Sequence, residues 1–241
     1  MNLLTDPVYS YRASPSQWLG PARRREPGIP FAKLPPIDVV LISHNHFDHL
    51  DLPTLKRLQA QSNPLIIVPL GNKALLEKAG LSRVKALDWW QSIEVKGTKI
   101  TLLPAKHSSQ RWGGDHNLSL WTAYGIQMGG KRIFFAGDTA YEDHFKVIRQ
   151  RWGRPDFSLL PIGEYAPRTL LQQEHLNPYE AVLAHRDLQS PLSLGIHFGT
   201  FLLGTSRPLI TLQDLDKARE KEGVSPEAFR VINEGESLVV P

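Results

Sequence analysis

Cysteine is absent from this chain of 241 residues. Disulfide bonds are therefore excluded, and the redox chemistry of thiols gives no information about the compartment. The absence also restricts metal chemistry, because any transition-metal site has to be built from histidine and carboxylate side chains alone.

Long hydrophobic runs are missing as well. No apolar stretch approaches the roughly 18 to 20 residues that span a bilayer, and the opening residues MNLLTDPVYS lack the basic and then apolar pattern of a signal peptide. The chain has 41% hydrophobic and 22% charged residues, a composition typical of a globular protein with a substantial core. We expect a cytoplasmic protein whose only membrane association would be peripheral contact.

The chain also has little excess of charge of either sign, because its formal net charge is only +4. The densest basic run is Arg23-Arg24-Arg25. A solvated loop is its default interpretation, and attraction to anionic lipid or nucleic acid is the alternative. No basic stripe interleaved with aromatic residues is present, so we expect no nucleic-acid partner.

Residues 1–36 are rich in proline, arginine and serine and are predicted to be mostly loop. After them, apolar periodicity predicts strands that alternate with helices, which favours a layered α/β fold. The predicted strands are residues 37–42, 65–68, 100–103, 118–128, 132–136, 157–160 and 192–196, and the predicted helices are residues 53–60, 72–78, 142–151, 178–185 and 212–222. A glycine pair at 129–130 indicates a hairpin.

A dense polar cluster follows the first predicted strand. His44, His46, Asp48 and His49 lie within six residues, and such side chains are poor core residues. Imidazole and carboxylate groups are both zinc ligands, and a turn after a strand lets them fan out around one point. The cluster predicts a metal site dense enough for two ions.

Three later residues also follow predicted strands: His107, Asp138 and His197. Taken singly, each has an ordinary explanation as a surface, turn or core residue. Binding groups collect beyond the carboxyl ends of strands in α/β sheets, so we expect the three to complete the site that begins at His44.

The pattern His-x-His-x-Asp-His, followed by a distant His, Gly-Asp-Thr and a final His, resembles the metallo-β-lactamase superfamily. Within it, the chain is similar to the N-acylphosphatidylethanolamine-hydrolysing phospholipase D group and its bacterial relatives. The similar segments are residues 6–9, 12–15, 41–51, 104–107, 134–139, 161–165, 175–178 and 196–201.

This resemblance implies a metallo-β-lactamase-like αββα sandwich, formed as a single domain by residues 1–241. Family members open with a pair of strands before the segment that begins at Asp6. Here only five residues precede Asp6, so we expect those first strands to be absent or replaced.

The resemblance also implies the ligands of two zinc ions, although other divalent metals suit the same side chains. His44, His46 and His107 would bind one ion, and Asp48, His49 and His197 the other. Asp138 would bridge them, and Asp48 and Asp138 are the predicted catalytic carboxylates. Two zinc ions, two carboxylates and a hydroxide leave the site about +1, which favours an anionic substrate.

A phosphodiester is accordingly the expected substrate, most specifically an N-acyl phosphatidylethanolamine-type phospholipid. The apolar residues Phe198, Phe201, Leu202, Leu203 and Trp112 are candidates for contact with lipid. A lactonase or other metal-dependent ester hydrolase and a non-catalytic metal-binding regulator are the alternatives. The sequence gives no oligomeric state, headgroup or acyl chain.

The remaining histidines are His116, His144, His175 and His185, and we assign none of them a catalytic role. Asp51, close to the first cluster, is expected either to orient an imidazole or to cap the helix that follows it.

Overall fold

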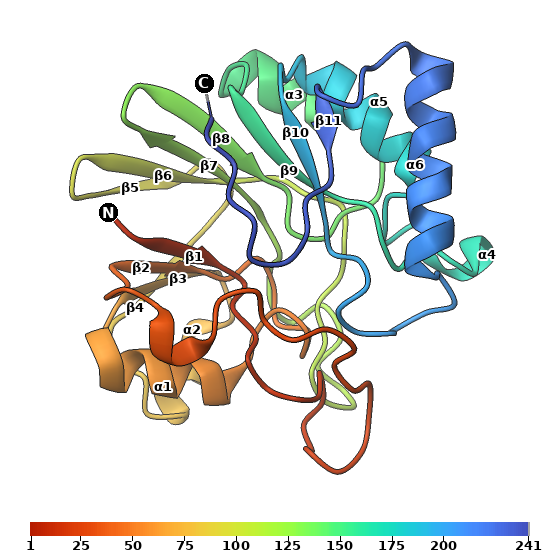
Figure 1. Cartoon of the computed structure of the whole chain (residues 1–241). Coiled ribbons are helices and arrows are strands. Elements are labelled where there is room, and N and C mark those ends of the chain that lie inside the picture. Colours follow the sequence, from red (N-terminus) through yellow and green to blue (C-terminus); the bar gives the residue numbers. More distant parts are fainter. Residues whose placement is uncertain (241) are drawn as a thin grey trace.

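The computed structural model describes residues 1–240 as two facing β-sheets with helices on both outer sides (Figure 1). The first sheet holds four parallel strands in the order β1-β2-β3-β4. They are β1 (Leu3–Thr5), β2 (Val39–Leu41), β3 (Leu65–Pro69) and β4 (Val84–Leu87).

The second sheet holds seven strands in the order β11-β10-β9-β8-β7-β6-β5. Neighbours from β5 to β8 are antiparallel, and neighbours from β8 to β11 are parallel. The strands are β5 (Ser92–Val95), β6 (Thr98–Leu103), β7 (Ala123–Met128), β8 (Lys131–Phe135), β9 (Phe157–Pro161), β10 (Ser193–Ile196) and β11 (Phe229–Arg230).

Helices cover the outer faces of the two sheets. On the first sheet they are α1 (Leu52–Ser62) and α2 (Lys73–Lys78), and on the second α3 (His144–Arg151), α5 (Pro178–Leu188) and α6 (Pro208–Glu222) (Figure 1). Two short elements, η1 (Phe31–Lys33) and α4 (Arg168–Leu171), lie in connecting segments. This arrangement confirms the predicted αββα sandwich. None of the helices in residues 1–240 has the length and hydrophobicity that a membrane span requires.

Strand periodicity explains the layers. Along β2, Val39 and Leu41 point into the core between the sheets, whereas Val40 and its neighbour Ile42 point into the core beneath α1. Successive side chains of a strand alternate between faces, so one short apolar run supplies two cores at once. The sandwich thereby buries β2 on both sides, and the chain leaves it directly into the histidine cluster.

Tyr124 on β7 joins the two sheets. Its side chain is fully buried, and its hydroxyl lies 2.8 Å from the carbonyl oxygen of Ile42 and 3.0 Å from that of Ile67. Ile67 belongs to β3 of the first sheet, and Ile42 directly follows β2. The contact fixes the second sheet against the segment that leads from β2 to His44.

Several predicted elements differ from the structure. Residues 1–36 are mostly loop, as predicted, but Leu3–Thr5 pairs with β2 as β1. The strand predicted at 118–128 begins only at Ala123. The segment before it crosses between the sheets and hydrogen-bonds to Leu70 and Ser43, which lie just after strands β3 and β2 of the first sheet. Strands β4, β5 and β11 were not predicted; they are short, and β4 and β5 are only partly buried.

Candidate metal centre

The site lies where four strands end. β2 leads to residues 44–49, β6 to His107, β8 to Asp138 and β10 to His197. These strands run in the same direction within their sheets, so their carboxyl ends meet at one edge of the sandwich. The structure brings all seven predicted site residues together there, in two groups.

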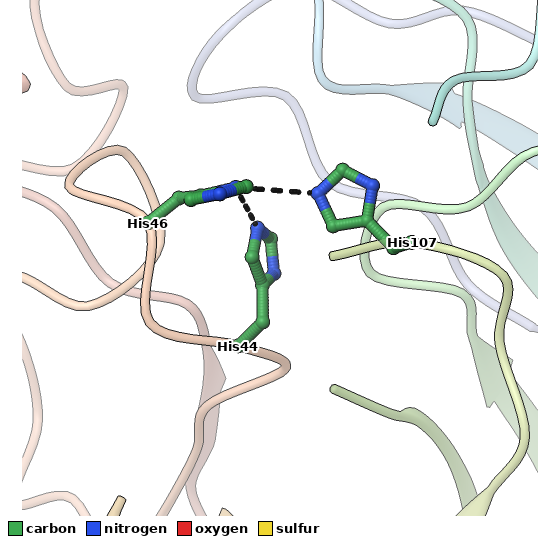
Figure 2. Close-up of side chains that lie close together, drawn as sticks. All are labelled: His44, His46 and His107. Carbon is green, nitrogen blue, oxygen red and sulfur yellow. Dashed lines mark hydrogen bonds between the residues drawn. The ribbon is translucent and has the colours of Figure 1, made fainter. Parts of the chain in front are cut away.

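The first group consists of His44, His46 and His107, whose ligand-type atoms lie within 4.8 Å of one another. Figure 2 shows the ring of His46 facing those of the other two. His46 Nδ1 lies 2.9 Å from His44 Nε2 and 3.2 Å from His107 Nε2. Three ring nitrogens from two distant parts of the chain therefore point at one spot.

The second group consists of Asp48, His49, Asp138 and His197. His49 Nε2 lies 3.0 Å from His197 Nε2 and 3.1 Å from Asp138 Oδ2. His197 Nε2 also lies 3.2 Å from Asp48 Oδ2. The group therefore offers two imidazole nitrogens and two carboxylate oxygens around one point.

Asp138 stands between the two groups. Its Oδ2 belongs to the second group and lies 3.9 Å from His107 Nε2 of the first. Its Oδ1 is buried and has no hydrogen-bond partner among the described residues. An ionised oxygen left in this way would be costly without a cation nearby.

Electrostatics favour the protonation states that metals need at His44, His107 and Asp138. At His49 and His197, by contrast, burial is outweighed by the carboxylates of Asp138 and Asp48, which raise the pKa, so a metal ion there would displace a proton. Burial lowers the pKa of His44 well below its usual value, and the neighbouring His49 and His107 lower it further. Burial lowers the pKa of His107 to about 3. Burial alone would raise the pKa of Asp138, but His197 and His49 hold that pKa well below the usual carboxyl value. Neutral imidazoles and ionised carboxylates are the forms that bind cations.

The donor geometry also fits metal ions. Two nitrogens bound to one tetrahedral zinc at about 2.1 Å lie about 3.4 Å apart. The distances of 2.9 and 3.2 Å around His46 are close to that spacing. Hydrogen bonding alone satisfies the group poorly, because His46 Nδ1 faces two nitrogens with at most one proton or one lone pair.

Two glycines permit this convergence. Gly137, just before Asp138, has a φ of +61°, and a Cβ there would lie 2.6 Å from Ser43 Cβ. A Cβ on Gly163 would lie 2.1 Å from the carbonyl oxygen of His197. His197 itself has a φ of +57°, an uncommon conformation for a residue with a side chain. The backbone is thus packed tightly around the ligand-type residues.

Contacts outside the two groups orient the imidazoles. His107 Nδ1 lies 2.8 Å from the carbonyl oxygen of Glu174, which leaves Nε2 free to face the site. His49 Nδ1 lies 2.7 Å from Asp6 Oδ2. Asp6 also accepts hydrogen bonds from the Ser43 backbone N–H at 2.7 Å and from the Ser43 hydroxyl at 2.5 Å. One carboxylate therefore fixes both an imidazole and the start of the histidine cluster.

Asp6 was not identified from the sequence, which left Asp51 either in this orienting role or as the cap of the following helix. Asp51 instead contacts Ser10 and Thr54 and makes no side-chain cap to α1. It therefore ties the N-terminal segment to α1. Asp6 could have been found only as a carboxylate next to β1, the strand that was missed.

His175 was also left without a role, yet it lies at the site. Its Nδ1 is buried without a hydrogen-bond partner among the described residues and lies 3.6 Å from Asp138 Oδ2. Its position just before the N-cap of α5 was the available sequence signal. His116 is exposed, and His185 contacts Ser193 away from the site.

The protein-family model described as the β-lactamase superfamily domain matches residues 1–198 of this chain. The chain belongs to this superfamily. N-acyl-phosphatidylethanolamine-hydrolyzing phospholipase D 1 of Caenorhabditis elegans is 37% identical, over 98% of this chain and 70% of that protein. The mitochondrial N-acyl-phosphatidylethanolamine-hydrolyzing phospholipase D of Saccharomyces cerevisiae is 35% identical, over 95% of this chain and 50% of that protein. The chain thus spans half of the yeast protein's length.

A solved structure shares the fold. The isothiocyanate hydrolase from Delia radicum gut bacteria is 19% identical and has a TM-score of 0.76, with 98% of this chain and 92% of that chain covered. These findings confirm the resemblance that the motifs indicated. Membership of the superfamily and two groups of side chains that could hold metal ions make this chain a metal-dependent hydrolase.

Replacing Asp6 should weaken metal binding at the second group. Asp6→Asn keeps the shape of the side chain but removes one acceptor oxygen and the charge that orients His49, and such outer contacts change metal affinity by roughly 10- to 100-fold. Competition with a chelator measures this affinity. Asp88→Asn, an exposed carboxylate between β4 and β5, is the matched control. Equal affinity in both variants would contradict the orienting role of Asp6.

Proposed function

We propose that this hydrolase holds two zinc ions and cleaves a phosphodiester, most specifically an N-acyl phosphatidylethanolamine-type phospholipid. The supporting observation is the position of Asp138 between two groups of donor atoms. His44, His46 and His107 would hold one ion, Asp48, His49 and His197 the other, and Asp138 both. Iron or manganese could occupy the same donors.

When bound, the ions would supply Lewis acidity and lower the pKa of water towards neutrality. The protein supplies the charge balance. Asp48 and Asp138 are the only carboxylates in the two groups. Two divalent cations would therefore leave the site with a net positive charge after the negative charges of these two carboxylates are subtracted. A positive, partly buried site binds an anionic phosphoryl group in preference to a neutral ester.

His175 is a candidate to contact the substrate. Its Nδ1 has no hydrogen-bond partner among residues 1–240 and lies 3.6 Å from Asp138 Oδ2. The ring of His175 is 5.2 Å from that of His107, between centroids. Arg168 donates a hydrogen bond to the His175 carbonyl oxygen at 2.7 Å and so fixes this segment. We therefore assign His175 the role of hydrogen-bonding an oxygen of the bound phosphodiester.

An apolar cavity next to the metal centre suits an acyl chain. Its volume is about 560 Å³, and Asp48 and His197 are among its lining residues. About half of its lining residues are aliphatic, proline or aromatic, and they include Leu4, Val8, Leu34, Leu194, Phe198, Phe201 and Leu203. A ligand with a charged phosphate and a long apolar tail would match both parts of this site.

Exposed apolar side chains near the cavity favour contact with a membrane surface. Leu202 and Leu203 are 43% and 40% exposed, directly after the cavity residue Phe201. The names of the nematode and yeast relatives specify the same class of phospholipid. Together these points support peripheral contact with a bilayer that contains the substrate.

The role of Asp138 is tested by substitution. Asp138→Asn should remove most turnover and release metal from the second group while the fold stays intact, because Asp138 is the only residue proposed to touch both ions. His116→Ala changes an exposed histidine outside both groups and should cost little. Turnover and metal content of the two variants are compared; equal losses would show that the ligand set is misassigned.

The substrate class is tested by a double substitution in the apolar surface. Leu202→Asp with Leu203→Asp should reduce hydrolysis of vesicle-borne N-acyl phospholipid at least tenfold more than hydrolysis of a short soluble phosphodiester. Val147→Asp on α3, with the same 43% exposure as Leu202, is the control. Equal effects on the two substrates would exclude lipid docking. Hydrolysis of lactones without phosphodiesterase activity would identify the protein as a lactonase. If neither substrate class were hydrolysed, the protein would be identified as a metal-binding regulator.

A further inference from the structure

The run Arg23-Arg24-Arg25 has no part in the metal centre, yet the fold places its members differently. Arg23 forms an antiparallel bridge with Phe201, and the Arg24 backbone N–H donates to the Thr200 carbonyl oxygen at 2.7 Å. Figure 1 shows the N-terminal loop and the connection from β10 to α6 at the same end of the molecule. Successive side chains of such an extended segment point to opposite sides.

Arg23 points inward. Its guanidinium donates to the carbonyl oxygen of Val8 at 2.5 Å and lies 4.9 Å from the centre of the Phe201 ring. Arg24 consequently points to the other side of the connection, where its side chain is exposed. Arg23 therefore has a structural role that Arg24 does not share.

Arg24 lines a second cavity of about 610 Å³, here called the arginine pocket. Its charged lining residues are Arg24, Arg25, Arg207 and Glu164. Arg25 is paired with Glu234 at 2.6 Å, and the Glu164 carboxylate accepts hydrogen bonds from the backbone N–H groups of Leu203 and Gly204.

Two guanidinium groups of the arginine pocket remain without a carboxylate. Among residues 1–240, no acidic side chain pairs with Arg24 or Arg207. A guanidinium presents a rigid fork of N–H donors that matches the oxygens of a phosphate. Two unpaired guanidiniums in one cavity therefore favour a phosphoryl anion as its ligand.

The position of the arginine pocket indicates which kind of molecule carries that phosphoryl anion. Glu164 and Phe201 line both the arginine pocket and the cavity that reaches the metal centre. Leu202 lines the arginine pocket, and the next residue, Leu203, lines the other cavity. The two cavities thus adjoin at one connecting segment, which carries the exposed leucines. A bilayer presents many phosphate headgroups side by side above an apolar layer, which matches this arrangement of charge and apolar surface.

We infer that the arginine pocket binds the headgroup phosphate of a second, uncleaved phospholipid in an anionic bilayer, and so holds the metal centre at the membrane surface. This inference rests on the proposed phospholipid substrate. Arg24 and Arg207 are the residues that recognise the phosphate.

Vesicle binding by the metal-loaded protein tests this inference. Vesicles of phosphatidylcholine alone are compared with vesicles of phosphatidylcholine and phosphatidylglycerol, and wild-type protein should partition more strongly to the second. A basic residue near an anionic surface contributes about fivefold in partitioning. Arg24→Gln with Arg207→Gln should therefore lower binding to the anionic vesicles by roughly 25-fold. Arg24→Lys with Arg207→Lys keeps the charge but not the fork of N–H donors, so its binding should lie between that of wild type and that of the Gln variant, which separates loss of charge from loss of folding.

Two exposed lysines on other elements provide the control, Lys56 on α1 and Lys85 on β4. Lys56→Gln with Lys85→Gln removes the same charge and should leave vesicle binding within twofold of wild type. An equal loss in this control would show that net charge, rather than the pocket, attracts the protein. Equal wild-type binding to both kinds of vesicle would also overturn the inference.

A free phosphate is the competing ligand, and calorimetry with inorganic phosphate at constant ionic strength identifies it. Phosphate binding that needs Arg24 and Arg207, without a preference for anionic vesicles, would assign the pocket to a soluble anion. Vesicle partitioning is measured without turnover, so the result decides the pocket's ligand even if no phosphodiesterase activity is found. Turnover on a short soluble phosphodiester separately decides the proposed function.

Discussion

The convergence of five imidazoles and two carboxylates at one sheet edge is the constraint on which the rest of the structure depends. These groups are largely buried, and each unpaired polar atom in such a place costs about 1 to 3 kcal/mol. Cations would offset that cost, whereas the polypeptide alone leaves Asp138 Oδ1 and His175 Nδ1 without hydrogen-bond partners among the described residues. The surrounding fold serves to hold these groups in place.

Three structural features keep the donors together from different sides. Tyr124 fixes the second sheet against the exit of β2, Asp6 fixes Ser43 and His49, and Gly137 allows the turn before Asp138 to approach Ser43. All three act on the short segment between β2 and the histidine cluster. The geometry of the first group is consequently coupled to the packing between the two sheets, which is where the apolar pattern of β2 places its side chains.

Much of the site could be predicted because its chemistry is concentrated in sequence. His44, His46, Asp48 and His49 are almost contiguous, and Asp138 and His197 each end an apolar strand, so the pattern and strand direction bring them together. Asp6 was out of reach because it acts on residues 37 and 43 positions away. Strands β4 and β5 were missed because their half-exposed residues lack the continuous apolar run that revealed β2. The separation of Arg24 from Arg23 depends on pairing with Phe201, which local sequence does not encode.

The central claim is that the two groups of donor atoms hold two metal ions. Elemental analysis of the purified protein after expression with added zinc measures this most directly. We expect close to two zinc equivalents per chain. Two equivalents of iron or manganese would keep the site and change the metal. Protein that contains no transition metal after this treatment would contradict the account.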